Sequence, residues 1–286
     1  MFDYQRGLML EAVALASGTP QAARGNWWLN RAPVSDGGSG WLFGRMRYNY
    51  NFRFDLLTTP DAEQAPTDLM YDASGTGVLF ARSDWTTSAS YLATLAGIYD
   101  QSHAHQDQGS FTFFKDTWLA VTSNMHSDSG INQGTDVHNV IRFSQGATVV
   151  PQNGSVSTKT VSDTGGILEV EMNLTPAYSA NASSVSSWTR ELTYDRSAHS
   201  LLVNDLCAKA SGVSATWQLH TPVLPVVQGD GSIVAGDLTI TPLVPAAPSI
   251  QIQSMPAISA QFNAGYRIEL AASGNGCEFR VLLQAN

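Results

Sequence analysis

The chain begins with a helical pattern of apolar residues and changes, from about residue 67, to short runs of strand type. Residues 2–15 place apolar side chains at a helical period, and the Gly-Thr-Pro sequence at 18–20 ends that run. Residues 22–33 predict a second short helix that Pro33 stops. Because residues 1–66 are too few for a helical domain of their own, we expect them to be the last helices of a larger helical part.

The strand-like runs alternate apolar and polar residues or are wholly apolar, and Gly, Asn, Asp, Ser and Pro separate them. Examples are GVLFARSDW at 77–85, SASYLATLAG at 88–97, GSFTFF at 109–114 and TWLAVTS at 117–123. The residues 115–117 predict a compact hairpin turn. More than ten such runs with little helix between them predict a mainly β fold, a large antiparallel β-sandwich over residues 67–286.

Composition narrows the possible partners. The net charge of −9 makes nucleic acid an unsuitable partner, and no apolar run is long enough for a membrane helix. The N-terminal stretch lacks the pattern of a secretory signal peptide, but the incomplete helical part leads us to expect a truncated chain. The sequence leaves open whether Cys207 and Cys277 form a disulfide or stay buried thiols.

The sequence SHAHQDQGSF places His103, His105 and Asp107 at alternate positions. In an extended strand these three side chains would project from the same face. His138 begins another strand-like run, HNVIRF. Imidazole is the commonest metal ligand, so the histidines could hold a zinc-like ion. The plainer alternative is a hydrogen-bonded polar patch at a sheet edge.

The stretch from TGVLFARSDW to WLAVTS, followed by VHNVIRF, resembles the core of the heparinase II/III-like family of polysaccharide lyases. That family has the motifs R-S-x-W, A-x-Y-L-A, H-x-H-x-D-x-G-S-F, W-L-A-V-D and H-N in this order. The likeness covers roughly residues 70–143, and WTRELTYDRSAHSLLVNDL extends it more loosely. Family members join an incomplete α/α toroid to a large antiparallel β-sandwich. The resemblance therefore implies that residues 1–66 are a remnant of the toroid.

The resemblance also implies roles for the three histidine positions. The first histidine of H-x-H takes part in catalysis in the family, which corresponds to His103. The second histidine and the histidine of H-N bind a structural zinc, which corresponds to His105 and His138. Asp107 is expected to hydrogen-bond a histidine N–H and to fix its tautomer.

The third zinc ligand of the family is the aspartate of W-L-A-V-D, and here the sequence departs. The strand reads WLAVTS, so Thr122 or Ser123 stands where the carboxylate is expected. A hydroxyl is a poor zinc ligand. The metal is then lost, held by two histidines and water, or completed by another carboxylate, of which Asp128 and Asp136 are the nearest.

Lyases of this type cleave the glycosidic bond beside a uronic acid by β-elimination. In this reaction hydrogen-bond donors neutralise the sugar carboxylate, a base removes the C5 proton and an acid protonates the leaving oxygen. Family members use toroid residues for part of this work. Arg45, Arg47, Tyr48 and Tyr50 are candidate substrate-binding residues, because the guanidinium fork suits carboxylates. The alternative is a helix or loop whose aromatic residues pack against the sandwich.

The functional hypothesis is a polysaccharide lyase, or its C-terminal portion, periplasmic or secreted and of unknown oligomeric state. With 15 basic and 24 acidic residues, the chain favours a weakly charged uronate polymer, such as alginate or a bacterial exopolysaccharide, over sulfated heparin. A cupin-like metalloenzyme is one alternative, although no glutamate follows H-x-H as in cupins. A non-catalytic carbohydrate-binding sandwich is the other.

Overall fold

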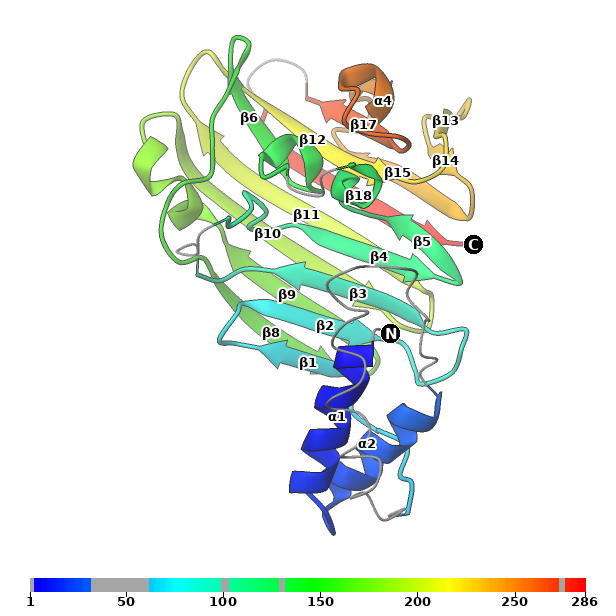
Figure 1. Ribbon diagram of the computed structural model, residues 1–286. Helices are drawn as coiled ribbons and strands as arrows, with labels where there is room; N and C mark the ends of the chain where they lie inside the picture. Colours follow the sequence, from blue (N-terminus) through cyan, green and yellow to red (C-terminus); the bar gives the residue numbers. More distant parts are fainter. Residues whose placement is uncertain (1–2, 32–61, 99–102, 129–131, 273–275) are drawn as a thin grey trace. The chain divides into compact units, whose positions relative to one another are not determined.

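The computed structural model describes residues 3–31, 62–98, 103–128, 132–272 and 276–286 (Figure 1). The chain divides into a helical unit, Met1–Asp68, and a β unit, Leu69–Asn286. Among the described residues, no helix combines the length and the apolar character that a membrane crossing requires.

The helical unit contains the two helices that the sequence predicts, α1 (Asp3–Leu15) and α2 (Pro20–Arg31). The hydroxyl of Thr19 accepts a hydrogen bond from the amide of Ala22, and proline occupies the first position of α2, where no intrahelical N–H is needed. The helices approach closely at Gly25, where a Cβ atom would overlap the side chain of Val13. The buried apolar residues between them are Leu10, Val13, Ala22 and Leu29.

The described residues of the β unit form three antiparallel sheets, which confirms the predicted fold class. The first has the order β1-β2-β3-β4-β5: β1 Met70–Ala73, β2 Val78–Arg82, β3 Ser90–Leu95, β4 Phe111–Lys115 and β5 Thr117–Ala120. The second has the order β13-β14-β15-β18-β11-β10-β9-β8: β8 Thr158–Thr164, β9 Ile167–Asn173, β10 Val185–Asp195, β11 Ser200–Lys209, β13 Val226–Val227, β14 Ile233–Ala235, β15 Leu238–Val244 and β18 Glu278–Ala285. The third has the order β16-β17-β12-β6-β7: β6 Ile141–Gln145, β7 Thr148–Val149, β12 Val213–Thr221, β16 Ser249–Ser254 and β17 Tyr266–Ala271. The short helical turns are η1 Ser123–His126, η2 Thr135–Val137, η3 Thr175–Asn181 and α4 Met255–Ile258.

The first and third sheets meet edge to edge and together face the second sheet (Figure 1). The amide of Val121, just after β5, donates to the carbonyl of His220 in β12 at 3.0 Å. Across the sandwich, the hydroxyls of Ser90 in β3 and Tyr194 in β10 lie 2.5 Å apart. The two smaller sheets therefore form one layer of the sandwich.

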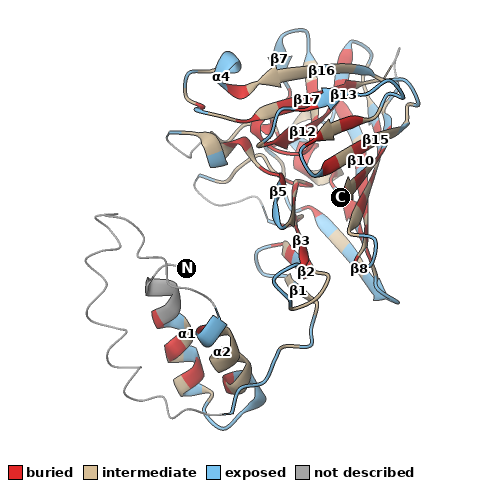
Figure 2. Ribbon diagram, turned by 90° about the vertical axis from the view of Figure 1, so that its right-hand side faces the viewer, coloured by how far each residue is buried: buried red, intermediate tan, exposed pale blue. Residues whose placement is uncertain are grey.

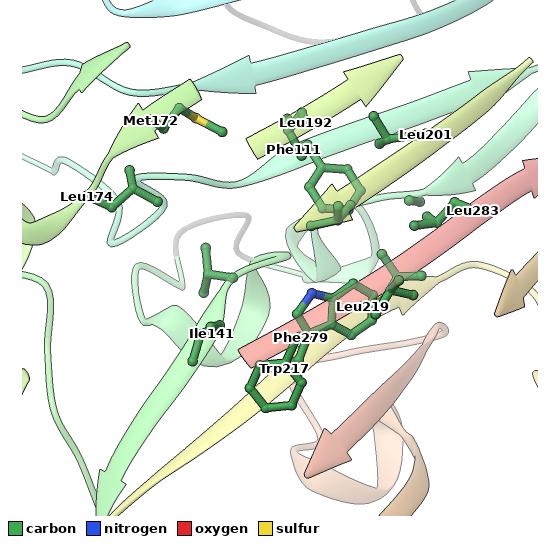
Figure 3. Packing of buried hydrophobic residues seen from close by; sticks show 14 of the residues in the cluster. Phe111, Ile141, Met172, Leu174, Leu192, Leu201, Trp217, Leu219, Phe279 and Leu283 are labelled. Atoms are coloured by element: carbon green, nitrogen blue, oxygen red, sulfur yellow. The ribbon is translucent and has the colours of Figure 1, made fainter. Parts of the chain in front are cut away.

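The core lies between the two layers and follows from the alternation along each strand. In β9, Leu168, Val170 and Met172 are buried, whereas Glu169 and Glu171 are exposed. Figure 2 colours the buried residues of the β unit red. Large side chains from all three sheets pack together there, including Phe111, Ile141, Leu192, Leu201, Trp217, Phe279 and Leu283 (Figure 3). Each fully buried side chain of this kind contributes about 2 kcal/mol to the free energy of unfolding.

A disulfide joins Cys207 in β11 to Cys277, just before β18. The two Cα atoms lie 5.1 Å apart, and the amide of Cys207 donates to the carbonyl of Cys277 at 2.8 Å. The alternative of two buried thiols, which the sequence left open, is therefore excluded in this structure.

Candidate functional site

The segment 103–110 is a loop, because β4 begins only at Phe111. His103, His105 and Asp107 were expected to share one face if the segment is extended, and the structure shows that it is not. His103 has a φ angle of 65°, and the carbonyl of Asp107 accepts a hydrogen bond from the amide of Ser110 at 2.8 Å, which closes a turn. These conformations break the alternation of side chains that an extended strand would give. His103 is exposed, whereas His105 is half-buried.

The loop brings His105 against His138, as the resemblance implies. Nδ1 of His105 lies 3.2 Å from Nε2 of His138, and the ring centroids are 5.2 Å apart. His138 does not begin a strand, since it follows η2 and two residues separate it from β6, and it is buried. Burial, followed by the charge of His105, lowers the pKa of His138 to about 3, and burial also lowers the pKa of His105. Both rings are therefore neutral at neutral pH.

Thr122 fixes the tautomer of His138. Its hydroxyl donates to the carbonyl of Val137 at 3.0 Å and lies 3.2 Å from Nδ1 of His138. Because the hydroxyl hydrogen is already used, Nδ1–H of His138 must donate to the Thr122 oxygen. Nε2 of His138 then carries a lone pair, which faces Nδ1 of His105 at 3.2 Å. Nδ1 of His105 also lies 3.4 Å from the amide nitrogen of Asn124.

Asp107 does not support either histidine in the way that the sequence predicted. Within the part of the chain that the structure describes, no hydrogen bond joins its carboxyl group to His105 or His138, and Thr122 serves His138 instead. Burial raises the pKa of the Asp107 carboxyl to about 7, although a backbone hydrogen bond opposes the shift. At neutral pH this carboxyl group is therefore divided between its neutral and charged forms.

The histidine pair lines a cavity of about 300 Å³. The cavity opens over β3 and β4, and His103 is not among its described lining residues. Its walls are mainly apolar with a few polar groups, which is typical of ligand sites. The lining residues are Val78, Ala93, Thr94, Leu95, His105, Asp107, Ser110, Phe111, Thr112, Thr122, Asn124 and His138.

The donor set at the histidine pair does not complete a structural zinc site of the usual kind. Such sites use four ligands drawn mainly from Cys, His, Asp and Glu, whereas the described residues contain no group of three or more of these side chains that could hold a metal ion. The third side chain at the pair is that of Asn124, whose Nδ2 lies 3.4 Å from Nδ1 of His105. Its amide group is neutral and does not supply the acidic ligand. Metal binding by His105 and His138 stays a prediction.

The buried side chain of Asn139 is a feature that the sequence reasoning missed. Its amide nitrogen donates to the carbonyls of Phe111 and Val121 at 2.8 and 3.0 Å, and its oxygen accepts from the amide of His220 at 2.8 Å. The H-N motif was visible, but only its histidine was given a role. The asparagine joins the segment that carries His138 to β4, β5 and β12.

The four residues predicted to bind substrate lie outside the described residues, so their role stays a prediction. They are Arg45, Arg47, Tyr48 and Tyr50.

Solved structures with a similar fold include polysaccharide lyases. Two structures of the heparan sulfate lyase HepC from Pedobacter heparinus, one of a mutant, align with TM-scores of 0.62 and 0.61 at 16% and 17% identity. They cover 99% and 98% of this chain and 41% and 42% of their own. A heparinase III structure aligns with a TM-score of 0.58 at 14% identity and covers 78% of this chain and 37% of its own.

These likenesses confirm the resemblance seen in the sequence at the level of the fold. No family model and no curated protein sequence matches the chain. The chain spans about two fifths of the length of the two heparan sulfate lyase structures.

Proposed function

We propose that the chain is a polysaccharide lyase, or the C-terminal portion of one, that cleaves a uronic-acid-containing polysaccharide by β-elimination. The observation that carries the proposal is the cavity of about 300 Å³ at the His-x-His loop, in a fold shared with heparan sulfate lyase and heparinase III. The match extends over nearly the whole chain, which leaves little room for the cupin-like alternative.

The reaction needs a base beside C5 of the uronate and an acid beside the leaving oxygen. The base takes the C5 proton, the electron pair of that C–H bond forms the C4–C5 double bond, and the C4–O bond breaks as its oxygen gains a proton. We assign His103 to this proton transfer, because it is exposed and lies two residues from the cavity-lining His105. The arginine and tyrosine residues at 45, 47, 48 and 50 are proposed to bind the acidic substrate.

The proposed substrate is an acidic polysaccharide, since the proteins of similar fold include lyases of heparan sulfate. The excess of acidic over basic residues favours alginate or a bacterial exopolysaccharide over a densely sulfated chain. The disulfide between Cys207 and Cys277 supports a periplasmic or secreted location, where disulfides persist.

The test is an ultraviolet assay for the 4,5-unsaturated sugar, with alginate, heparan sulfate and bacterial exopolysaccharides as substrates and the longest natural form of the protein. We expect His103→Ala to lower kcat by about 100-fold or more while the protein stays folded. His199→Ala provides a control histidine outside the cavity lining and should keep the wild-type rate. An unchanged rate in His103→Ala would remove the catalytic role of this residue.

A non-catalytic carbohydrate-binding sandwich is the second candidate. Three aromatic side chains of the first sheet are exposed, Tyr71 by 68%, Phe80 by 52% and Trp118 by 41%, and such rings stack well on sugars. Binding without any unsaturated product, weakened by Trp118→Ala and unaffected by His103→Ala, would favour this candidate.

A further inference from the structure

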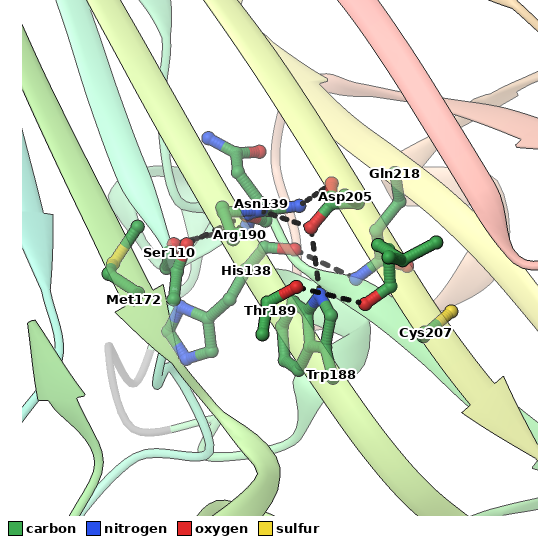
Figure 4. Close-up of polar contacts among 12 residues, drawn as sticks. Ser110, His138, Asn139, Met172, Trp188, Thr189, Arg190, Asp205, Cys207 and Gln218 are labelled. Carbon is green, nitrogen blue, oxygen red and sulfur yellow. Dashed lines mark hydrogen bonds and ion pairs between the residues drawn. The ribbon is translucent and has the colours of Figure 1, made fainter.

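The guanidinium of Arg190 is a buried clamp between four acceptors (Figure 4). Nε and Nη2 donate to the two carboxylate oxygens of Asp205, both at 2.8 Å. Nη1 donates to two backbone carbonyls, that of Gly109 at 2.8 Å and that of Asn139 at 2.6 Å. Both side chains of the ion pair are completely buried.

The two carbonyls belong to the two segments that carry the histidine pair. Gly109 lies in the loop that holds His105, one residue before its end, and Asn139 directly follows His138. Arg190 lies in β10 of the facing sheet, 81 residues from Gly109 and 51 from Asn139 in sequence. One nitrogen atom from the opposite layer therefore joins the two halves of the candidate site.

The surroundings hold the clamp in a single geometry. Nε1 of Trp188 donates to Oδ1 of Asp205 at 2.7 Å and fixes the carboxylate from the side. Gly109 has a φ angle of 85°, and a Cβ atom there would overlap the side chain of Leu174. Glycine at this position lets the loop carbonyl come within reach of the guanidinium.

Stability alone gives a weak reason for this arrangement. Replacing a buried ion pair by well-packed apolar side chains of similar volume is often neutral or stabilising. What an apolar pair cannot do is hold two carbonyls from separate segments at a fixed separation. The rigid guanidinium fork, with several N–H groups in one plane, is suited to that task.

We propose that Arg190 is a positioning residue, which sets the spacing between the His105 loop and His138 through its bonds to the carbonyls of Gly109 and Asn139. Asp205 holds the guanidinium in place for this purpose. The catalytic consequence rests on the proposed lyase function, whereas the geometric consequence does not.

The experiment uses two variants in the full chain, Arg190→Lys and the double variant Arg190→Met with Asp205→Leu. The first keeps the charge but loses the planar fork, and the second removes both charges together, so that no unpaired charge is left buried. The matched control is Arg196, which forms a two-bonded ion pair with Asp163 at 2.6 and 2.8 Å and does not line the cavity. The control variants are Arg196→Lys and Arg196→Met with Asp163→Leu.

The first readout is the ¹H–¹⁵N spectrum of the imidazole groups, with signals assigned by single His→Gln variants. We expect both Arg190 variants to move the signals of His105 and His138, and the Arg196 controls to leave them in place at a similar loss of thermal stability. Unmoved signals in the Arg190 variants, or equal movement in the controls, would overturn the proposal. If neither Arg190 variant folds while the controls do, Arg190 is required for folding and the proposal also fails.

The second readout is lyase activity, with kcat and KM measured separately. We expect the Arg190 variants to lower kcat by about tenfold or more with little change in KM, because small displacements of catalytic groups act mainly on the chemical step. No lyase activity in the longest natural form of the wild-type protein would contradict the proposed function, while the imidazole spectra would still decide the positioning role.

Discussion

The hydroxyl oxygen of Thr122 lies 3.2 Å from Nδ1 of His138, while Nε2 of the same ring lies 3.2 Å from His105. Thr122 is one of the two residues, with Ser123, that stand where the resemblance to the heparinase II/III-like family leads us to expect an aspartate. The threonine therefore contacts the edge of the His138 ring that is turned away from His105 and determines which nitrogen of His138 carries the proton. Thr122 therefore supports His138, the residue that His105 of the His-x-His loop contacts, without a metal ion.

Thr122→Val should destabilise the protein, because the buried Nδ1–H of His138 loses its acceptor. We expect a loss of about 1–3 kcal/mol in the free energy of unfolding, measured by urea denaturation. Thr112→Val is the matched control, since Thr112 lines the same cavity from β4. Equal effects of the two substitutions would show that the contact with His138 contributes nothing.

Asn124→Asp should convert the histidine pair into a metal site. The new carboxylate would lie near Nδ1 of His105, where the amide nitrogen is now 3.4 Å away, and would supply the missing acidic ligand. We expect below about 0.2 zinc ions per chain for the wild type and close to about one for the variant by elemental analysis. Zinc should also raise the melting temperature of the variant alone.

Asn124→Ala provides the control for zinc bound elsewhere on the chain. One equivalent of tightly bound zinc in the wild type would show that a further ligand completes the site and would restore the structural metal predicted from the family.

His220 should make the protein less stable in mildly acidic solution. Burial, and then the charge of Arg267, holds the pKa of His220 well below its ordinary value of 6.5. Below pH 6.5 the His220 side chain is protonated in the unfolded chain but stays neutral in the folded chain. The contribution of His220 to the free energy of unfolding is therefore fully present above this pH and is lost progressively as the pH falls. The slope contributed by this group is at most about 1.4 kcal/mol per pH unit.

Urea denaturation between pH 7.5 and pH 5 measures this slope. His220→Gln should reduce the slope without abolishing it, because burial also lowers the pKa of His138 to about 3. His103→Gln, which changes an exposed ring, should leave the profile as in the wild type. A profile with the same slope in all three proteins would contradict the assignment to His220.

Removal of the disulfide by Cys207→Ala with Cys277→Ala should lower the free energy of unfolding. The bond closes a loop of 70 residues, for which the chain-entropy estimate is about 4 kcal/mol. Denaturation of the variant and of the wild type with and without reductant gives the measurement. A wild type insensitive to reductant even when unfolded would show that the bond is not formed in the protein.

The sandwich could be predicted because each strand is recognisable from its own local sequence pattern. The alternation in β9, with Leu168 and Val170 inward and Glu169 outward, follows from a period of two and needs no tertiary information. The turn at 115–117 is equally local, since Asp116 accepts the φ angle of 58° that the hairpin requires. Both predictions are confirmed.

The site could be predicted only in part, because its contacts are long-range. The pattern His-x-His suggested a strand, but the left-handed conformation of His103 and the turn at Asp107 end the extended run before β4. The meeting of His105 and His138 came from the family resemblance. The hydrogen bonds from Arg190 to Gly109 and Asn139 join residues 81 and 51 positions apart in the sequence, and no local sequence pattern predicts them.

Asn139 has a consequence for how this protein opens. Its side chain is bonded to Phe111 and Val121 on the side of the first sheet and to His220 in the third, so it closes the seam between them. The seam cannot part without breaking all of these buried bonds together. Amide hydrogens along it should therefore exchange with solvent only when the whole β unit unfolds, which would make the candidate site one of the slowest-exchanging regions of the molecule.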